Sequence, residues 1–393
     1  MGNPHIIVMP YPAQGHVIPM LELSQQLTNH HFKFTFVNTD FDHRCITKSL
    51  SDSDNILEQV TMLNPRRIGA MGGQKLRKGK GLRGRLSVRR RLVFNIPRMV
   101  SDGIVDDNGK PLKNQTIHFS PAMPPINSNN FIWTHFGDLS AQRRIFHILV
   151  RNNNFSSKFT NWLICNSSYD LEPGVFSLYQ NIVPIGPLLV KNRLGKSLTI
   201  FDQEQFEELA LGLELTNRPF LWVVRQDITS GTGMKAYHQT IHLSHSDIDI
   251  IYPKGFKERV EKSGQRVRWA PQEEVLSHPS IALFISHCGW NSTIEGVSNG
   301  VPFLCWPHFL DQFINRSYIV DCWEVGLELE KEECGIVRKE ELRNKVELVM
   351  SDKRYKTRAL NLQSKVVSSA AEGSSQKNFS NFADWIKENK VIY

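Results

Sequence analysis

The residues best suited to chemistry lie between positions 269 and 312, where an aromatic ring, a histidine and a helix start occur close together. Residues 281–286 form an apolar run typical of a strand, and a helix is predicted to open at Trp290, Asn291 and Ser292. The free N–H groups and positive dipole end of such a helix suit a phosphate. His287 adds a hydrogen-bond donor, or a charge when protonated. The pattern therefore predicts an anion site between a strand and a helix.

Four further side chains extend this site towards a sugar nucleotide. Trp269 ends a predicted strand and could stack on a planar base, and Glu295 lies one helical turn after Ser292, where a carboxylate could accept from two ribose hydroxyls. Asp311 and Gln312 follow a later strand and suit sugar hydroxyls. Each has a plainer interpretation, such as a core tryptophan, a surface glutamate or an N-cap. Their joint order favours a site for a nucleotide joined to a sugar.

A second histidine with possible chemistry stands near the N-terminus. His16 follows Gly15 at the start of an amphipathic segment. Imidazole titrates near neutral pH, so it could accept a proton from a hydroxyl group. The plainer alternative is a histidine at a helix N-terminus with no catalytic role.

Alternating strands and helices position these residues. In the first half, strands are predicted at 5–10, 32–37, 162–166 and 182–189, with a helix at 16–27. In the second half, a helix at 202–215 capped by Asp202 precedes strands at 220–224, 266–269, 281–286, 301–306 and 325–329, with helices at 273–277, 292–298 and 312–322. This alternation predicts doubly wound parallel sheets. The site residues fall beyond the carboxyl ends of strands, where ligands of such sheets bind.

The chain length fits two Rossmann-like α/β domains that face a cleft. A chain of 393 residues is too long for one ordinary core. We expect an N-terminal domain at 1–190, a C-terminal domain at 191–375, and a helix at 376–393 that packs back on the first domain. That last segment carries three apolar residues able to dock, namely Phe379, Phe382 and Trp385.

Composition excludes several classes of protein. Hydrophobic content of 40% and charged content of 22% are typical of a soluble globular protein. The six cysteines show no C-x-x-C pattern and no Cys/His cluster, so we expect no disulfide scaffold and no zinc site. We also expect no metal and no cofactor. No apolar run approaches the ~18 residues of a membrane span, and the start of the chain lacks signal-peptide features. We expect a cytoplasmic monomer.

The net charge of +8 is concentrated in one segment. Residues 66–91 contain eleven Lys or Arg, six Gly and no acidic residue, whereas the rest of the chain carries a net charge of −3. The segment is predicted to be a disordered insert, because it is too polar and Gly-rich to bury a core. It could instead bind nucleic acid or another polyanion, although it has no aromatic residue for base stacking. An out-of-frame or aberrantly spliced passage is a third interpretation.

Residues 269–312 resemble the signature box of plant family-1 UDP-dependent glycosyltransferases, enzymes of the two-domain GT-B fold. The resemblance covers all 44 positions without a gap. It implies that Trp269 stacks on uracil, whose polar edge meets the Ala270 backbone and the Gln272 side chain. It assigns the diphosphate and ribose to His287, Asn291, Ser292 and Glu295, and the donor sugar to Trp290, Asp311 and Gln312. The N-terminal segment PYPAQGHVIPML is also similar, and it places His16 at the family's catalytic base.

The implied activity is transfer of glucose from UDP-glucose to a hydroxyl of a small lipophilic acceptor, with inversion at the anomeric carbon. A glutamine at position 312 usually accompanies UDP-glucose in this family. The helix start and His287 would neutralise the leaving UDP without a metal. The expected partners are the UDP-sugar and the acceptor, with no nucleic acid and no membrane span.

The chain departs from the family pattern at two apparent internal deletions. The aspartate of an Asp-x-x-x-x-Trp-type segment, which normally orients the catalytic histidine, has no counterpart, and residues 66–91 stand where it should lie. In the second domain the linker after Leu189 runs almost directly into the helix at Asp202, without the expected first strand and Gly-Ser loop. Residues 230–251 look inserted. Both domains are thus expected to be incomplete, and a catalytically impaired relative that only binds UDP-sugar is the alternative function.

Overall fold

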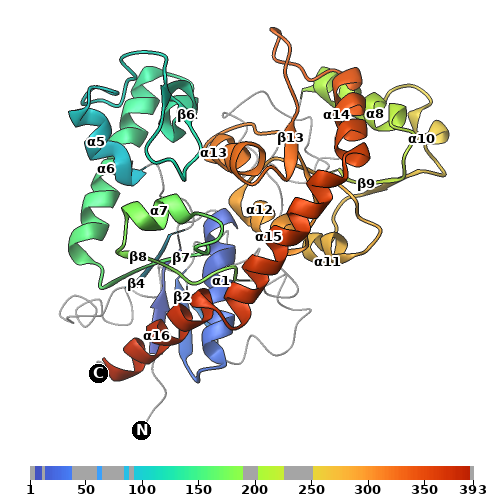
Figure 1. Cartoon of the computed structure of the whole chain (residues 1–393). Coiled ribbons are helices and arrows are strands. Elements are labelled where there is room, and N and C mark those ends of the chain that lie inside the picture. Colours follow the sequence, from blue (N-terminus) through green and yellow to red (C-terminus); the bar gives the residue numbers. More distant parts are fainter. Residues whose placement is uncertain are drawn as a thin grey trace. The chain divides into compact units, whose positions relative to one another are not determined.

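The computed structural model describes residues 5–10, 14–37, 60–63, 84–87, 93–188, 202–224 and 251–389, without the side chains of 14–16, 60–63, 84–87 and 155–159. Contacts divide the chain into two compact units (Figure 1). Unit 1 comprises Met1–Val93, Val150–Lys196 and Lys365–Tyr393, and unit 2 comprises Phe94–Leu149 and Ser197–Ser364. The contact-based units do not follow the expected boundaries at 190 and 375. Residues 94–149 group with the second half of the chain, and residues 365–393 group with the first half.

Unit 1 contains two parallel sheets. β1 (His5–Val8), β2 (Lys33–Val37) and β3 (Val60–Leu63) form one in the order β1-β2-β3, with α1 (Gln14–Thr28) connecting the first two strands. β4 (Gly84–Ser87), β7 (Trp162–Cys165) and β8 (Ile182–Pro184) form the other in the order β4-β7-β8, with α7 (Pro173–Leu178) between β7 and β8. The parallel strand–helix–strand crossover predicted at the N-terminus is confirmed.

β4 corrects part of the expectation for the basic segment. Residues 84–87 pair in parallel with 162–165 of β7, so the prediction of disorder throughout 66–91 was wrong for these four residues. Their local sequence is Arg- and Gly-rich, but the edge of a buried strand supplies hydrogen-bond partners that no local pattern reveals. Residues 66–83 and 88–91 lie outside the described residues.

The C-terminal helix α16 (Ser374–Glu388) completes the core of unit 1. Its Phe379 and Phe382 are buried in one apolar cluster with Phe34 and Phe36 of β2. Asn378 of the same helix donates a hydrogen bond to the Pro184 carbonyl at 2.8 Å. Trp385, the third residue predicted to dock, is partly buried against this core.

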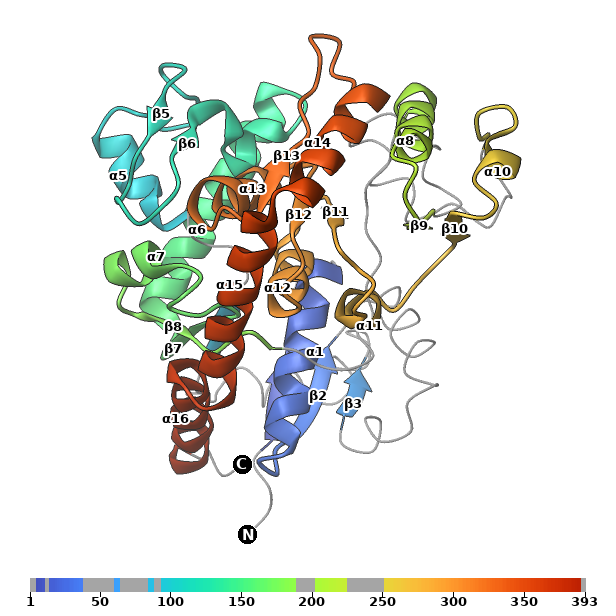
Figure 2. The ribbon, with the colours of Figure 1, turned by 45° about the vertical axis from the view of Figure 1, so that its right-hand side comes forward.

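Unit 2 also contains two parallel sheets (Figure 2). β9 (Phe220–Val223) pairs with β10 (Gly264–Val267), and β11 (Phe284–Ser286), β12 (Phe303–Cys305) and β13 (Gly326–Glu328) follow in the order β11-β12-β13. Every strand predicted in this half is present; β10 has the predicted length but begins two residues earlier, and the other four are shorter than predicted. α8 (Gln203–Leu215) begins where predicted, and the Asp202 side chain accepts from the Gln205 N–H at 2.8 Å.

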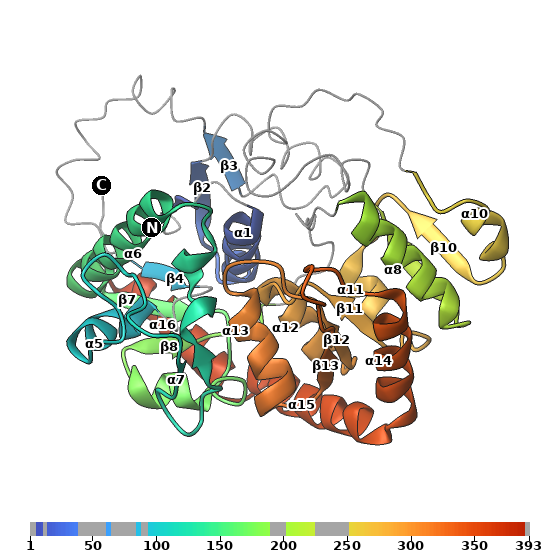
Figure 3. The ribbon, with the colours of Figure 1, turned by 90° about the horizontal axis from the view of Figure 1, so that it is seen from above.

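Helices connect these strands and cover the sheets. α10 (Phe256–Arg259), α11 (Gln272–Ser277), α12 (Trp290–Ser298) and α13 (Gln312–Ser317) precede α14 (Lys339–Ser351) and α15 (Lys353–Ala371). The helix predicted at 312–322 changes to a π-helix, η4, at Tyr318–Cys322. α8 and α14 pack side by side, with Leu342 of α14 against Gly212 of α8 (Figure 3).

Residues 94–149 form a small subdomain of unit 2. It contains α5 (Ile96–Ser101), the antiparallel pair β5 (Thr116–Ile117) and β6 (Ile126–Asn127), and the start of α6 (Leu139–Phe159). Buried Trp133 holds it together, because its Nε1 donates to the Gly109 carbonyl at 2.6 Å and its ring packs on Phe131 and Phe146.

The predicted fold class, α/β with doubly wound parallel sheets, is confirmed. In each unit, however, the parallel strands among the described residues form two sheets that share no hydrogen-bonded pair of strands. No helix in the described ranges is long and apolar enough to cross a membrane.

Candidate functional site

A sharp backbone turn joins β11 to α12. Cys288 is buried and adopts φ +61°, a left-handed conformation that non-glycine residues rarely take. Its N–H donates to Ser286 Oγ at 3.1 Å, and its carbonyl accepts from Asn315 Nδ2 of α13 at 2.8 Å. Neighbouring elements thus hold the turn that brings the strand end to the helix start. α12 begins directly after this turn, and the predicted anion site would lie at that helix start.

Gly289 is required by the histidine beside it. A Cβ atom at position 289 would collide with the His287 imidazole, because the ring lies directly over the glycine backbone. His287 is half-buried. The glycine therefore lets a histidine fold back over the helix start, where its ring nitrogens add to the backbone N–H groups.

Three of the predicted site residues make direct contact. The Gln272 amide of α11 donates to Ser292 Oγ at 2.9 Å and to the Glu295 carboxylate, both on α12. Ser292 and Glu295 are buried, with Glu295 only 2% exposed. The resemblance had assigned Gln272 to the base edge, Ser292 to the diphosphate and Glu295 to the ribose. Their contact shows that these groups lie in one connected polar cluster.

Two tryptophans of the predicted site differ in exposure. Trp269 is 50% exposed and lies two residues beyond β10, before half-buried Ala270. That exposure excludes an ordinary core tryptophan and leaves an indole face for a planar ligand. Trp290 is 1% exposed and packs near Trp323. If Trp290 contacts a sugar, as the resemblance implies, its backbone makes the contact, because its indole is buried.

Asp311 and Gln312 organise the loop before α13. The Gln312 Oε1 accepts from the backbone N–H groups of His308 at 2.8 Å and Phe309 at 3.1 Å, and Asp311 Oδ2 accepts from Asn315 Nδ2 at 3.0 Å. Both side chains are buried. Because the Gln312 oxygen is used by the loop, its amide nitrogen is the group that can donate to a sugar hydroxyl.

His308 and Asn315 belong to this site although sequence reasoning did not single them out. Burial, with smaller contributions from nearby Lys331 and His287, lowers the pKa of His308 to about 3. His308 is therefore neutral at pH 7 and lies within the electrostatic reach of His287. The available signal was spacing, since His308 stands three residues before Asp311 and Asn315 stands one helical turn after it.

The predicted base, His16, lies in the first turn of α1 in unit 1. Its side chain is outside the described residues, so its role stays a prediction. Asn291 is half-buried in the first turn of α12, and its contact with a diphosphate stays a prediction.

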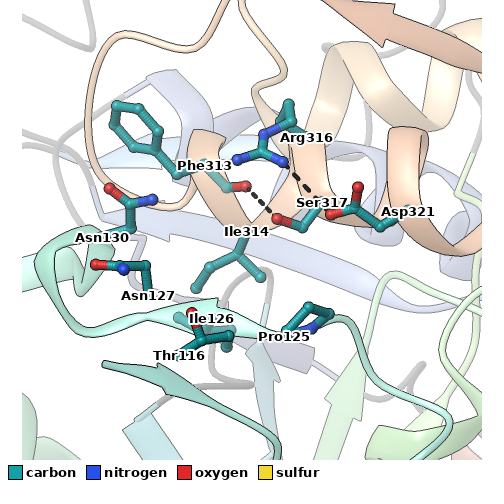
Figure 4. A pocket seen from close by; sticks show the side chains of 10 residues that line it. All are labelled: Thr116, Pro125, Ile126, Asn127, Asn130, Phe313, Ile314, Arg316, Ser317 and Asp321. Carbon is teal, nitrogen blue, oxygen red and sulfur yellow. Dashed lines mark hydrogen bonds and ion pairs between the residues drawn. The ribbon is translucent and has the colours of Figure 1, made fainter. Parts of the chain in front are cut away.

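A separate cavity of about 180 Å³ lies beside α13 in unit 2 (Figure 4). The Arg316 side chain at its rim forms ion pairs with Asp321 at 3.4 Å and Glu328 at 3.1 Å. None of the predicted site residues lines it; the lining residues are Thr116, Pro125, Ile126, Asn127, Asn130, Phe313, Ile314, Arg316, Ser317 and Asp321.

Comparison with curated proteins shows relatives that match nearly the whole chain. UDP-glycosyltransferase 83A1 of Arabidopsis thaliana is 32% identical over 480 residues, covering 98% of this chain and 97% of that protein. Linamarin synthase 1 of Manihot esculenta is 25% identical over 498 residues, covering 98% and 96%. The 480 positions of the first alignment exceed the 393 residues of this chain by 87. At least that many positions therefore have no counterpart here.

Solved structures show the same fold. Phytolacca americana UGT2 complexed with UDP-2fluoro-glucose and pterostilbene gives a TM-score of 0.78 at 22% identity, covering 98% of this chain and 99% of that one. A UDP-glucosyltransferase from Polygonum tinctorium gives 0.75 at 21% identity, covering 98% and 99%.

The profile of the family described as UDP-glucoronosyl and UDP-glucosyl transferase matches residues 194–367, which include the entire polar cluster around α12. The signature residues, the paired parallel sheets and the 32% identity to a full-length relative agree. The chain belongs to the plant family-1 UDP-dependent glycosyltransferases of the GT-B fold.

Proposed function

We propose that this protein transfers glucose from UDP-glucose to a hydroxyl group of a small lipophilic acceptor and inverts the anomeric carbon. The observation that carries the proposal is the contact of Gln272 with Ser292 and Glu295 beside the start of α12. That cluster gathers, in one place, groups suited to a ribose and a diphosphate. The protein structures with which the chain was compared include a complex with UDP-2fluoro-glucose, which supports a glucose donor.

The donor would extend along the cluster from base to sugar. Uracil stacks on the exposed face of Trp269, and the ribose hydroxyls donate to Glu295. The diphosphate accepts from the first N–H groups of α12 and from His287. Glucose then meets Asp311 and the Gln312 amide nitrogen. This arrangement stabilises the leaving diphosphate by fixed donors and requires no metal.

The chemical step is a single displacement. The acceptor oxygen bonds to the anomeric carbon while the bond from that carbon to the UDP oxygen breaks, and His16 takes the acceptor proton. In-line attack gives a β-glucoside from the α-linked donor. Because we expect this chain to lack the aspartate that would orient His16, turnover should be slower than in relatives that retain it. We also expect a cytoplasmic monomer.

The test measures turnover and binding separately. Purified protein is incubated with UDP-glucose and a panel of phenols and aliphatic alcohols, products are identified by mass spectrometry, and the anomeric configuration is read by NMR. UDP binding is measured by calorimetry on the same preparation. We expect a β-glucoside with at least one acceptor.

Matched variants define what each outcome means. Trp269→Ala and Glu295→Ala should abolish UDP binding, whereas Glu274→Ala, an exposed residue of α11, should not change it. His16→Ala should abolish product but leave UDP binding intact. Intact UDP binding by the unchanged chain with no product from any acceptor would contradict the transferase proposal and leave the UDP-sugar-binding alternative.

A further inference from the structure

The cavity beside α13 lies within unit 2 and is separate from the candidate donor site (Figure 4). One wall is formed by β5, β6 and the turn after β6, and the other by α13 and the π-helix η4. The lining residues Thr116 and Asp321 are exposed, so solvent reaches the cavity. Its volume of about 180 Å³ corresponds to about six water molecules. That space suits a ligand the size of one substituted six-membered ring.

The wall at β5 and β6 carries uncharged groups that can form hydrogen bonds. Asn127 Oδ1 accepts from the Asn129 N–H at 2.9 Å, which leaves the Asn127 amide nitrogen as a donor. Among the described residues, none forms a hydrogen bond with the Asn130 amide or the Thr116 hydroxyl. A primary amide and a hydroxyl each donate and accept. This wall therefore offers both kinds of group to one ligand.

The wall at α13 adds polar groups whose charges balance. Ser317 Oγ donates to the Phe313 carbonyl at 3.2 Å, so its lone pairs can accept a further hydrogen bond. The two charged lining residues, Arg316 and Asp321, form an ion pair at 3.4 Å. Glu328, which does not line the cavity, pairs with the same guanidinium at 3.1 Å. The lining thus has no net charge with which to select an anion or a cation.

Apolar side chains complete the lining. They are Pro125, Ile126, Phe313 and Ile314. The Phe313 ring stacks on the His135 imidazole, with centroids 4.6 Å apart and planes at 6°, and this contact fixes the ring. Burial lowers the pKa of His135, so the imidazole is neutral at pH 7 and adds no charge behind Phe313. The cavity therefore combines uncharged hydrogen-bonding groups with apolar surfaces.

We propose that this cavity binds one uncharged pyranose, either a free hexose or the sugar of a glycoside. Each hydroxyl of a pyranose donates and accepts, which matches a lining that carries both kinds of group. The C–H groups of the ring are apolar and suit the side chains of Phe313 and Ile314. A wholly apolar ligand would leave the asparagine amides without partners, at a cost in free energy. The proposal does not depend on the proposed transferase activity.

A matched set of small molecules tests the ligand class by saturation-transfer NMR on the full chain. D-Glucose and methyl β-D-glucoside distinguish a free hexose from a glycoside. Glucuronate and protonated glucosamine add a negative or a positive charge to the same ring, and cyclohexanol lacks the other hydroxyls. We expect at least one neutral sugar to bind with a Kd on the order of 1 mM, and the other three compounds at least about threefold more weakly. Binding of neither neutral sugar, or equal or tighter binding of any of those three, would overturn the proposal.

Substitutions at neighbouring positions locate the bound sugar. Asn130→Leu removes an amide from the lining and should weaken sugar binding about tenfold. Asn129→Ala changes an exposed side chain outside the lining and should have little effect. Thr116→Val removes an exposed hydroxyl with little change of shape, and should weaken binding about threefold even if Asn130→Leu does not fold. Unchanged binding in Thr116→Val and in a folded Asn130→Leu would overturn the proposal.

The candidate donor site is the competing location for a bound sugar. Sugar held there would be lost in Gln312→Ala and retained in Asn130→Leu, and that result would also overturn the proposal. Calorimetry with UDP keeps the two proposals apart, because Asn130→Leu should leave UDP binding unchanged. Sugar binding that depends on Asn130, in a chain that neither binds UDP nor forms product, would refute the proposed function and support this second site.

Discussion

The two halves of unit 2 differ in how completely their strands are covered. Phe303, Leu304 and Cys305 of β12 are fully buried, whereas Leu221 and Val223 of β9 are exposed. The residues proposed to bind phosphate and ribose follow β11, in the buried half, but Trp269 follows β10, in the exposed half. The difference teaches that the residue proposed to stack on the base and the residues proposed to bind phosphate follow strands of separate sheets, and that Gln272 of the intervening α11 contacts α12.

The largest expected effect comes from a substitution that leaves a cavity in the buried half. Phe303 is fully buried, and its ring fills the space that a Cβ at Gly296 would need. Phe303→Ala should lower the free energy of unfolding by about 3–5 kcal/mol. Chemical denaturation measures this free energy. Phe220→Ala, on partly buried β9, is the matched variant, and we expect its loss of unfolding free energy to be less than half as large. Equal losses would contradict the contrast between the halves.

The neutral histidine of the buried half should make stability pH-dependent. The folded pKa of His308 is about 3, below its ordinary 6.5, so between these values the unfolded chain binds a proton that the folded chain does not. His308 therefore makes stability fall as pH drops from 6.5 towards 3, by up to about 1.4 kcal/mol per pH unit. His308→Asn should remove this component when unfolding is measured across that range. Parallel curves for the two proteins would show that His308 does not titrate this way.

The hydrogen bonds of Gln272 to α12 should affect the affinity for UDP. Gln272→Ala removes hydrogen bonds to Ser292 and Glu295, and should weaken UDP binding about tenfold by calorimetry. In a double-mutant cycle with Glu295→Ala, the two effects should couple by more than about 0.5 kcal/mol. Additive losses would mean that Gln272 acts on the base edge alone, as the resemblance implied.

The smallest effect belongs to the exposed face of β9. Val223→Thr keeps the branched shape and should change the free energy of unfolding by less than about 0.5 kcal/mol, because Val223 is 43% exposed. Thermal or chemical unfolding gives the value. A loss of 2 kcal/mol or more would show that this face is covered in solution.

Sequence periodicity located most elements to within a few residues. α8 follows its Asp202 cap, and the strand–turn–helix around Gly289 lies where its apolar run and polar helix start predict. The local sequence pattern could not show which strands pair with one another. Residues 84–87 form a strand because β7 offers an edge.

Residue type predicted which residues belong to the candidate site better than it predicted which of their side chains touch. The exposure of Trp269 agrees with a stacking platform, yet the burial of Trp290 could not be inferred, because tryptophan suits a core and a ligand equally. The polar cluster around Gln272 depends on how α11 meets α12, a tertiary relation with no sequence period. His308 was missed because only its three-dimensional surroundings keep it neutral.

The position of α16 has a consequence for synthesis on the ribosome. Phe379 and Phe382 belong to the same apolar cluster as β1 and β2, so the first strands translated wait for nearly the last helix before their core closes. Nascent chains usually fold domain by domain from the N-terminus. Here the order is inverted: unit 1 begins emerging first and cannot finish folding before α16 has been synthesised. During that interval its apolar strands are the part of the nascent chain with the greatest need of a chaperone.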